Sequence, residues 1–403
     1  MKNRLPNLLL ALVSVLLVVA FALAADWLLG WLSRDSRVAS GLLFPPNVRA
    51  TYDTYEFTFA AAINDLGFRD VETPLETERA TRIVVLGDSF TFGWGVELEQ
   101  TWVKRLEEAL RARGRDVEVL NLGSPGFGPH DYARTAAEVV PVLRPDVVLV
   151  GLLQTDDLRQ AERIPEDDSA PLESGGGLAR QWFPNFTALA TRERARMAAS
   201  VEDTNRERWN SIDVRESWKR STREMHAAAT PEELVRFASL DAELQEAFHA
   251  GRVNPILHPH FLMRNDAFPE YELDLQSERM RQRISEAGSA MERIRRVADD
   301  NGARVIGLSI PWSLRSSREV WEMLRRLGRP SHEDELTTTV PDEAAAAAFG
   351  QAGIESLEVT EAFRAVEAES LLFYTLDTHF NAEGNRAYAE LLVPLVEARV
   401  FAD

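Results

Sequence analysis

The sequence contains no cysteine among its 403 residues. This absence excludes disulfide bonds, a cysteine nucleophile, thiolate metal sites and a lipid-modified N-terminal cysteine. It does not identify the compartment, because many exported bacterial proteins also lack cysteine. Any nucleophile must therefore come from another residue type.

Basic residues are in deficit, with 45 lysines and arginines against 64 acidic residues and a formal net charge of −19. Such a chain repels phosphate backbones, so we expect no nucleic-acid partner. The hydrophobic content of 45% and charged content of 27% are typical of a folded globular protein. The length predicts either one domain with a large insertion or two domains.

Charge is absent over one long stretch, from Leu5 to Ala25, which as a helix would measure roughly 30 Å and could cross a bilayer core. Lys2 and Arg4 precede it, and the positive-inside rule then places the N-terminus in the cytoplasm. We therefore interpret residues 1–33 as a single-pass anchor in the bacterial inner membrane, with the remaining chain periplasmic or extracellular.

A cleaved signal peptide is the alternative for this segment, because Ala22-Leu23-Ala24 resembles a signal-peptidase site. The apolar run is long for a signal, however, and it resumes after Asp26 with Trp27 and Trp31 at positions typical of a membrane interface. These features favour the uncleaved anchor.

Short apolar runs alternate with helical patterns through most of the remaining chain, which is typical of βαβ units around a buried parallel sheet. The predicted strands are Arg82–Gly87, Val117–Leu122, Asp146–Leu153, Ala303–Ile310 and Ile354–Val359. The predicted helices are Thr101–Arg113, Asp131–Leu143, Leu275–Asp300 and Ala382–Arg399, the last capped by Asn381, with a second helical excursion over Arg318–Phe349.

We assign residues 82–158 and 275–403, where strands and helices alternate, to one α/β domain. Two segments outside it lack this alternation. Residues 34–81 are turn-rich and are interpreted as a tether packing on the main domain. Residues 159–274 carry loop signals followed by charged helical patterns, and we interpret them as a helical insertion or cap.

Several strand ends carry residues suited to chemistry, and ligands of open α/β sheets bind beyond the carboxyl ends of the strands. Gly87-Asp88-Ser89 follows the first strand, Asn121 to Gly126 ends the second, Thr155-Asp156-Asp157 follows the third, and Leu376 to Asn381 precedes the final helix. A serine, a histidine with a nearby carboxylate, and glycines that expose backbone N–H groups are the parts needed for acyl transfer.

These blocks resemble those of the SGNH (GDSL-type) hydrolases. The resemblance rests on "GDSFTFG" from Gly87, "NLGSPG" from Asn121 and "DTHFNAEG" from Asp377, and it covers roughly 82–160 and 280–398. The lead-in "INDLGFRD" from Ile63 is similar to that of membrane-anchored bacterial members. The resemblance implies a three-layer α/β/α domain of flavodoxin-like type.

It further implies that Ser89 is the nucleophile, His379 the general base and Asp377 the carboxylate that orients it. The backbone N–H groups of Ser89 and Gly123 would supply two donors of the oxyanion hole. Physical chemistry agrees, because a serine hydroxyl needs a base to take its proton and a neutral imidazole needs an acceptor on its other nitrogen.

The third block departs from the family, which has Gly-x-Asn-Asp where this chain has Gln154-Thr155-Asp156-Asp157. The asparagine is the last oxyanion donor, and an ionised Asp156 cannot donate. Losing one such donor typically costs about 10² to 10³ in rate. Three interpretations stay open: Asp156 is protonated because Asp157 and Asp88 are near, Gln154 or Thr155 donates instead, or the protein is catalytically weak.

Two other kinds of site are disfavoured. A phosphate-binding loop at Gly123 would lack the donors that Pro125 and Pro129 remove, and no Lys-Ser/Thr pair follows. His258-Pro259-His260 has no carboxylate at ligand-like spacing, so we expect a surface loop there. We expect no metal and no cofactor.

The sequence thus predicts a serine esterase or O-acyltransferase at the cell envelope. The expected substrates are O-acylated glycans or small acyl esters, and the expected further partner is the membrane. The oligomeric state is not predicted. A non-catalytic glycan-binding or polysaccharide-assembly protein of the same fold is the alternative, which Asp156 favours.

Overall fold

The computed structural model describes residues 13–14, 17–28, 42–75, 79, 81–162, 213–262, 273–329 and 332–401. The predicted membrane span, Leu5 to Ala25, lies partly outside these ranges. Within them, no helix combines the length and the apolar character needed to cross a membrane.

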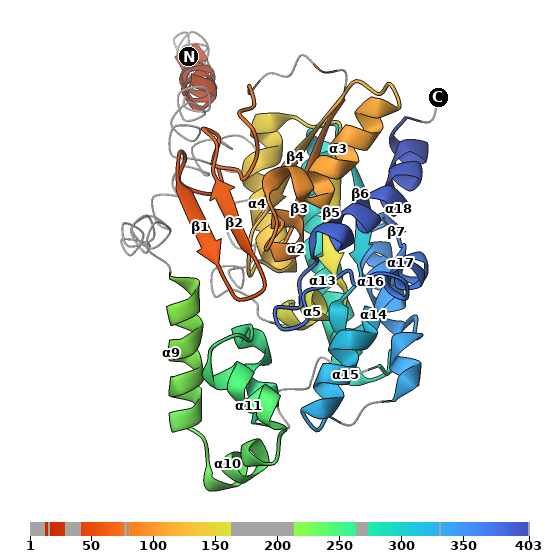
Figure 1. The fold of residues 1–403 in the computed structure, drawn as a ribbon. Coiled ribbons are helices and arrows are strands. Elements are labelled where there is room, and N and C mark those ends of the chain that lie inside the picture. Colours follow the sequence, from red (N-terminus) through yellow and green to blue (C-terminus); the bar gives the residue numbers. More distant parts are fainter. Residues whose placement is uncertain are drawn as a thin grey trace, which may run out of the picture.

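The centre of the molecule is a five-stranded parallel sheet in the order β4-β3-β5-β6-β7 (Figure 1). This is the doubly wound 2-1-3-4-5 order, so the predicted flavodoxin-like α/β architecture is present. Its strands are β3 (Thr81–Gly87), β4 (Val117–Gly123), β5 (Val147–Leu153), β6 (Arg304–Ile310) and β7 (Glu355–Leu357).

Helices cover both faces of this sheet, and the strand pleat assigns alternate side chains to each face. Ile83 and Val85 belong to the core shared with α3 (Trp102–Ala112) and α18 (Ala382–Val400). Val84 and Leu86 belong to the core shared with three other helices. These are α4 (Pro129–Leu143), α13 (Glu278–Asp300) and α16 (Val340–Gln351).

Short helices connect the strands to these layers. After the strands come α2 (Ser89–Phe92), η1 (Leu98–Gln100) and α5 (Gln154–Gln160), and later α14 (Ser313–Ser316), α15 (Arg318–Arg326), η5 (Glu333–Leu336) and α17 (Thr360–Glu367). Of these, α15 and η5 fall in the predicted helical excursion over residues 318–349, and the others were not predicted. The predicted cap of the last helix is confirmed, since Asn381 Oδ1 accepts from the N–H of Gly384 at 2.9 Å.

The segment interpreted as a tether contains a β-hairpin, which sequence patterns did not reveal. Strands β1 (Arg49–Asp53) and β2 (Thr58–Ala62) pair antiparallel beside the domain (Figure 1). Tyr52, Phe57 and Phe59 pack with Phe92 at the end of α2 in one buried cluster. The hairpin therefore forms part of the wall next to the predicted nucleophile.

Arg69 fastens this segment to the main domain. Its Nη1 donates to the carbonyls of Phe92 and Gly93 at 2.8 and 2.7 Å, and its Nη2 donates to those of Ala60 and Val96 at 3.0 and 2.6 Å. The guanidinium also lies over the rings of Phe59 and Phe92. A buried cation that donates to four carbonyls and lies against two aromatic faces fixes the end of α2 against the hairpin.

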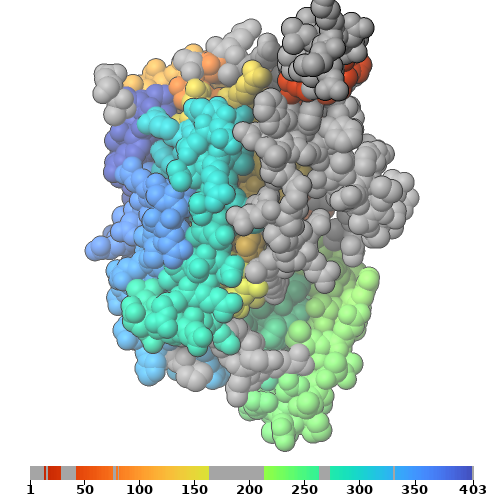
Figure 2. All heavy atoms as spheres, turned by 180° about the vertical axis from the view of Figure 1, so that it is seen from behind, coloured from red at the N-terminus to blue at the C-terminus, as the bar shows by residue number. Residues whose placement is uncertain are grey.

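The described part of the insertion is helical. It contains α9 (Val214–Ala227), α10 (Pro231–Ala238), α11 (Ala242–His249), η2 (Pro255–Leu257) and α12 (His258–Phe261). Seen from behind, the green residues of α9 and α10 lie at the lower end of the molecule (Figure 2). Phe237 of α10 and Phe248 of α11 belong to the same core cluster as Ile83 and Val85 of β3. Helix α9 meets the hairpin, where Arg215 donates to Asp53 and to the carbonyl of Thr54.

The prediction of a surface loop at His258–His260 is wrong. Both histidines are buried in α12, and His258 bridges Ser221 Oγ at 3.1 Å and the carbonyl of Val253 at 3.0 Å. Burial lowers the pKa of His258 to about 4, so this imidazole is neutral at physiological pH. Its role is to join α9 to the chain around α12.

Candidate active site

The structure brings Ser89, His379 and Asp377 into one hydrogen-bonded chain. His379 Nε2 lies 2.7 Å from Ser89 Oγ, and its Nδ1 lies 2.6 Å from Asp377 Oδ1. The serine follows β3, whereas the other two residues lie in the loop before α18, so the fold joins positions 290 residues apart. This is the geometry in which an imidazole can take the serine proton while a carboxylate holds its other nitrogen.

Ser89 is held by the short helix that it begins. Asp88 caps α2 by accepting from the N–H of Phe90 at 2.9 Å, and Gly93 closes it in the left-handed conformation. The N–H of Ser89 makes no hydrogen bond within the part of the chain that the structure describes. It is therefore available to a substrate oxygen.

The loop that carries His379 and Asp377 has a constrained backbone. Thr378 between them has φ +75°, a conformation that β-branched residues rarely adopt. The loop is closed by a bond from the N–H of Tyr374 to the carbonyl of His379, at 2.9 Å, and by the bridge between Phe373 and Phe380. Such a conformation persists only where surrounding contacts enforce it.

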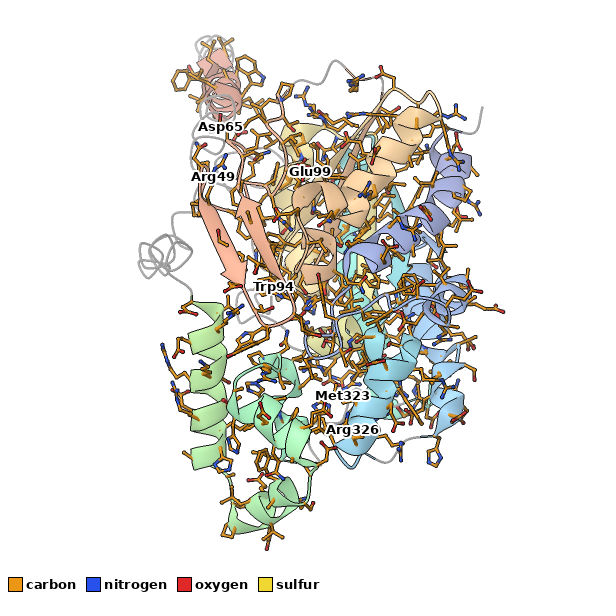
Figure 3. The ribbon with its side chains drawn as sticks, viewed as in Figure 1. Arg49, Asp65, Trp94, Glu99, Met323 and Arg326 are labelled. Carbon is orange, nitrogen blue, oxygen red and sulfur yellow. The ribbon has the colours of Figure 1, made fainter. Side chains whose placement is uncertain are left out.

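Contacts from two distant segments fix the buried Asp377. Its Oδ2 accepts from Trp94 Nε1 at 3.3 Å and from Asn254 Nδ2 at 3.0 Å. Asn254 belongs to the insertion, so the cap contributes directly to this site. Trp94 lies beside the hairpin in Figure 3, with its ring centroid 6.2 Å from that of His379. Sequence reasoning did not place either residue at the triad, because Trp94 lies just after the first recognised block and Asn254 lies in the insertion.

The charges around His379 favour its protonated form. Burial opposes protonation, but Asp377, and more weakly Asp88 and Asp156, outweigh it, so the pKa of His379 lies above its ordinary value. A base with a raised pKa loses its capacity to accept a proton as the pH falls through that value. Activity that depends on neutral His379 should therefore decline as the pH falls through this raised pKa.

Three buried carboxyl groups, those of Asp88, Asp156 and Asp157, interact electrostatically near the triad, and they differ in their partners. The guanidinium of Arg159 donates to Asp156 Oδ1 at 2.6 Å, and the side-chain amide of Gln160 donates to Asp156 Oδ2 at 2.7 Å. Asp157 accepts from Tyr132 Oη at 2.9 Å and from the N–H of Leu153 at 2.8 Å. Burial, followed by the charges of the other two acids, raises the pKa of Asp157 well above its ordinary value.

Burial likewise raises the pKa of Asp88 to about 7, with the charge of Asp156 adding to the effect and that of His379 opposing it. The like-charge repulsion that the sequence suggested is thus present. It favours protons on Asp157 and Asp88, whereas Asp156 is paired with a guanidinium, an arrangement suited to an ionised carboxylate.

Gln154, offered as a substitute oxyanion donor, is committed elsewhere. Its Nε2 donates to Asp342 Oδ1 at 3.0 Å and to Thr360 Oγ1 at 2.9 Å, while its Oε1 accepts from the N–H of Trp312. This prediction is wrong, because the amide ties β5 to α16 and α17. Thr155, the other substitute, is buried.

Gly123 is placed beside α2, but its N–H donates to Asn121 Oδ1 at 3.0 Å. A Cβ at this position would lie 2.1 Å from the nitrogen of Phe92. The glycine is therefore required for packing of the nucleophile helix on β4, whatever it also does for a substrate. An oxygen that binds at this N–H must replace the Asn121 side chain.

Comparison with known proteins finds similarity over part of the chain. No protein-family model matches the chain. Over 83 residues, 21% of this chain, it is 30% identical to an arylesterase of Vibrio mimicus. The chain resembles the SGNH hydrolases. It spans only 42% of that relative's length.

Solved structures show distant similarity. The chain matches TesA with 11% identity and a TM-score of 0.37, over 78% of this chain and 98% of that one. A lipolytic G-D-S-L protein of Veillonella parvula has 10% identity and a TM-score of 0.36, over the same shares. The acetyl xylan esterase AlAXEase has 11% identity and a TM-score of 0.37, over 78% of this chain and 99% of that one.

A cavity of about 990 Å³ is lined by none of the three triad residues. It lies between α11, α15 and α17 and reaches the back of the catalytic loop at Thr375 and Leu376. Met323 and Arg326 of α15 line it opposite α11 (Figure 3). Among the described residues, no group of three or more histidine or carboxylate side chains could hold a metal ion.

Proposed function

We propose that this protein is a serine esterase or O-acyltransferase with Ser89 as nucleophile, His379 as general base and Asp377 as its orienting carboxylate. The observation that carries the proposal is the hydrogen-bonded chain from Ser89 Oγ through both nitrogens of His379 to Asp377. A serine with such a base attacks carbonyl carbon, so ester bonds are the substrate class.

The reaction proceeds in two halves. His379 Nε2 takes the proton as Ser89 Oγ bonds to the ester carbonyl, and the oxyanion meets the free N–H of Ser89. The imidazolium then protonates the leaving alcohol oxygen as the C–O bond breaks, which leaves an acyl-enzyme. Water or an acceptor hydroxyl, deprotonated by His379, releases the acyl group and regenerates Ser89.

Hydrolase and transferase differ only in the acceptor of the acyl group. O-acylated glycans or small acyl esters at the cell envelope are the substrates we propose, on the strength of the expected location. Incubation of an acyl donor with a sugar acceptor in water separates the two activities. Acetylated sugar as the main product supports the transferase, and free acetate supports the esterase.

A non-catalytic glycan-binding or assembly protein is the second candidate, because Asp156 stands where an oxyanion donor is expected and is paired with Arg159. Turnover of p-nitrophenyl acetate by the full chain in detergent tests it. No turnover and no reaction of Ser89 with a fluorophosphonate would favour this candidate over the enzyme.

Asp156→Asn is expected to raise ester turnover by about tenfold, because an asparagine can keep an oxygen for Arg159 and, once the Gln160 amide turns away, direct an N–H toward the oxyanion. The kcat on p-nitrophenyl acetate measures this. Asp131→Asn is the matched control, since this acid is paired with Arg134 on α4. A fall in kcat would show instead that the effect of the Asp156 charge on His379 contributes more to the rate than a hydrogen-bond donor at this position would.

We also propose that the N-terminal segment anchors the protein in the membrane with the catalytic domain outside. The uncharged run from Leu5 to Ala25 supports this, as does the exposure of Phe21 (78%) and Trp27 (72%) in the helical residues 17–28. The full chain is expected to stay with membranes after carbonate extraction, and a fragment starting at Arg34 is expected to be released. Release of both would contradict anchoring.

A further inference from the structure

We propose that Glu56 is a positioning residue of the catalytic loop. Its carboxylate reaches from the turn of the β1–β2 hairpin and holds three successive backbone N–H groups, those of residues 375–377. Glu56 thereby fixes Asp377 and, through it, the imidazole of His379. The inference rests on the proposed esterase activity and names a residue that lies outside every recognised block.

The three hydrogen bonds define the contact. Glu56 Oε1 accepts from the N–H of Thr375 at 2.9 Å, and its Oε2 accepts from those of Leu376 and Asp377 at 3.0 and 2.7 Å. Convergent backbone N–H groups form a concave site for an anion. A single carboxylate thus satisfies the backbone directly before the strained Thr378, which has φ +75°.

The hairpin turn that presents Glu56 is itself rigid. Thr54 Oγ1 accepts from the N–H groups of Glu56 and Phe57 and donates to the carbonyl of Phe57. The ring of Phe57 packs on Tyr374 with centroids 4.6 Å apart, and Tyr374 Oη donates to the carbonyl of Gly95. These contacts therefore fix the position of the Glu56 carboxylate relative to the catalytic loop.

Asn254 of the insertion also binds the catalytic loop, through the carbonyl of Leu376 and the side chain of Asp377. The N–H of Asn254 donates to the carbonyl of Leu376 at 3.0 Å, and its side chain donates to Asp377 Oδ2. Hydrogen bonds thus fix both the side chain and the backbone of Asp377, and Glu56 accepts the hydrogen bond from its backbone N–H. Loss of the hydrogen bonds to Glu56 should displace the Asp377 carboxylate from His379 Nδ1 and lower the rate without changing ester binding.

The charge of Glu56 depends on pH near neutrality. Burial raises the pKa of Glu56 to about 7, with the charge of Asp377 adding to the effect and the three N–H groups opposing it. Titratable groups facing it are Asp377 and Tyr374 in the loop, and Glu243, Arg252 and Glu367 around the same cavity. Below this pKa the protonated carboxyl accepts less strongly, so the hold on the loop weakens as pH falls.

The test compares wild type with Glu56→Gln in the full chain, using kcat and KM on p-nitrophenyl acetate across pH. At about pH 8.5 we expect kcat about tenfold lower in Glu56→Gln, with KM within about twofold. At about pH 5.5 wild-type Glu56 is itself neutral, so the ratio of the two kcat values should shrink to below about twofold. A purely structural role would leave that ratio independent of pH.

Glu97→Gln is the matched control, because Glu97 also accepts a backbone N–H of the hairpin, that of Ala60, but does not contact the catalytic loop. We expect its kcat to match wild type at every pH. Equal kcat of wild type and Glu56→Gln at about pH 8.5, or a ratio constant with pH, would overturn the role of Glu56.

Glu56→Asp keeps the charge on a shorter side chain and serves if Glu56→Gln does not fold, as judged by thermal unfolding. Its kcat at about pH 8.5 is expected to be at least about threefold below wild type, and equality would overturn the proposal. Failure of the proposed function is a separate outcome, because wild type itself would then show neither turnover nor fluorophosphonate labelling.

Discussion

Ser89→Ala should abolish ester turnover, lowering kcat on p-nitrophenyl acetate by about 10³-fold or more. The hydroxyl is the group of the triad that bonds to the ester carbonyl carbon in the proposed mechanism, and its single described side-chain contact is His379 Nε2 at 2.7 Å. Removing the oxygen therefore removes the acyl-enzyme route while leaving the positions of His379 and Asp377 intact.

The fold should tolerate this substitution, because α2 is held by the Asp88 cap and by Arg69 rather than by the hydroxyl. Ser239→Ala is the matched control, since Ser239 is exposed at the end of α10 and bonds only the carbonyl of Arg236. Its turnover should equal wild type. Undiminished turnover in Ser89→Ala would exclude Ser89 as the nucleophile.

Asp377→Asn should lower kcat by about 10³-fold, although it changes one atom. Asp377 accepts hydrogen bonds on both oxygens, from His379 Nδ1 on one and from Trp94 and Asn254 on the other. An amide must place its NH₂ against one of these sets. Facing His379, it would force the tautomer whose Nε2 carries a proton and cannot take one from Ser89.

The alternative orientation of the amide would oppose two N–H donors in a buried site, which costs about 1–3 kcal/mol. In that orientation the amide oxygen keeps the tautomer of His379 but carries no charge to stabilise the imidazolium. The base is thus impaired in either orientation, so the kcat should fall more than the stability does. Asp116→Asn, at an exposed acid paired with Arg79, is the control and should leave kcat unchanged. Normal kcat in Asp377→Asn would show that His379 is oriented by other groups.

Much of the domain could be predicted from sequence because its signals are local. The apolar runs before Ser89 and at residues 146–153 correspond to β3 and β5, and the helix after Asn381 follows its cap. The three triad residues stood in recognisable blocks, and the parallel sheet topology explains why strand ends so distant in sequence converge.

The remainder could not be predicted, because it depends on contacts between segments with no shared pattern. Polar and apolar residues alternate too weakly over residues 49–62 to distinguish a hairpin from a tether. The contact of Glu56 with the catalytic loop could therefore not be predicted. Asn254 lies in an insertion without any recognised motif. Gln154 looked free to donate because its partners, Asp342 and Thr360, come from distant helices.

Position 156 carries the main departure from the resemblance. The structure pairs Asp156 with Arg159 and Gln160, while raised pKa values at Asp157 and Asp88 favour protons on the other two acids. The negative charge of Asp156 lies near enough to His379 to raise its pKa. The carboxylate thus stabilises the imidazolium electrostatically, even though it offers no donor to an oxyanion.

The most direct test of the central claim is the reaction of the full chain with a fluorophosphonate, followed by mapping of the adduct by mass spectrometry. Wild type is expected to carry one phosphonyl group on Ser89, Asp377→Asn to react far more slowly, and Ser89→Ala to remain unmodified. An adduct on a different serine, or no adduct on folded wild-type protein, would contradict the assignment of Ser89 as an activated nucleophile.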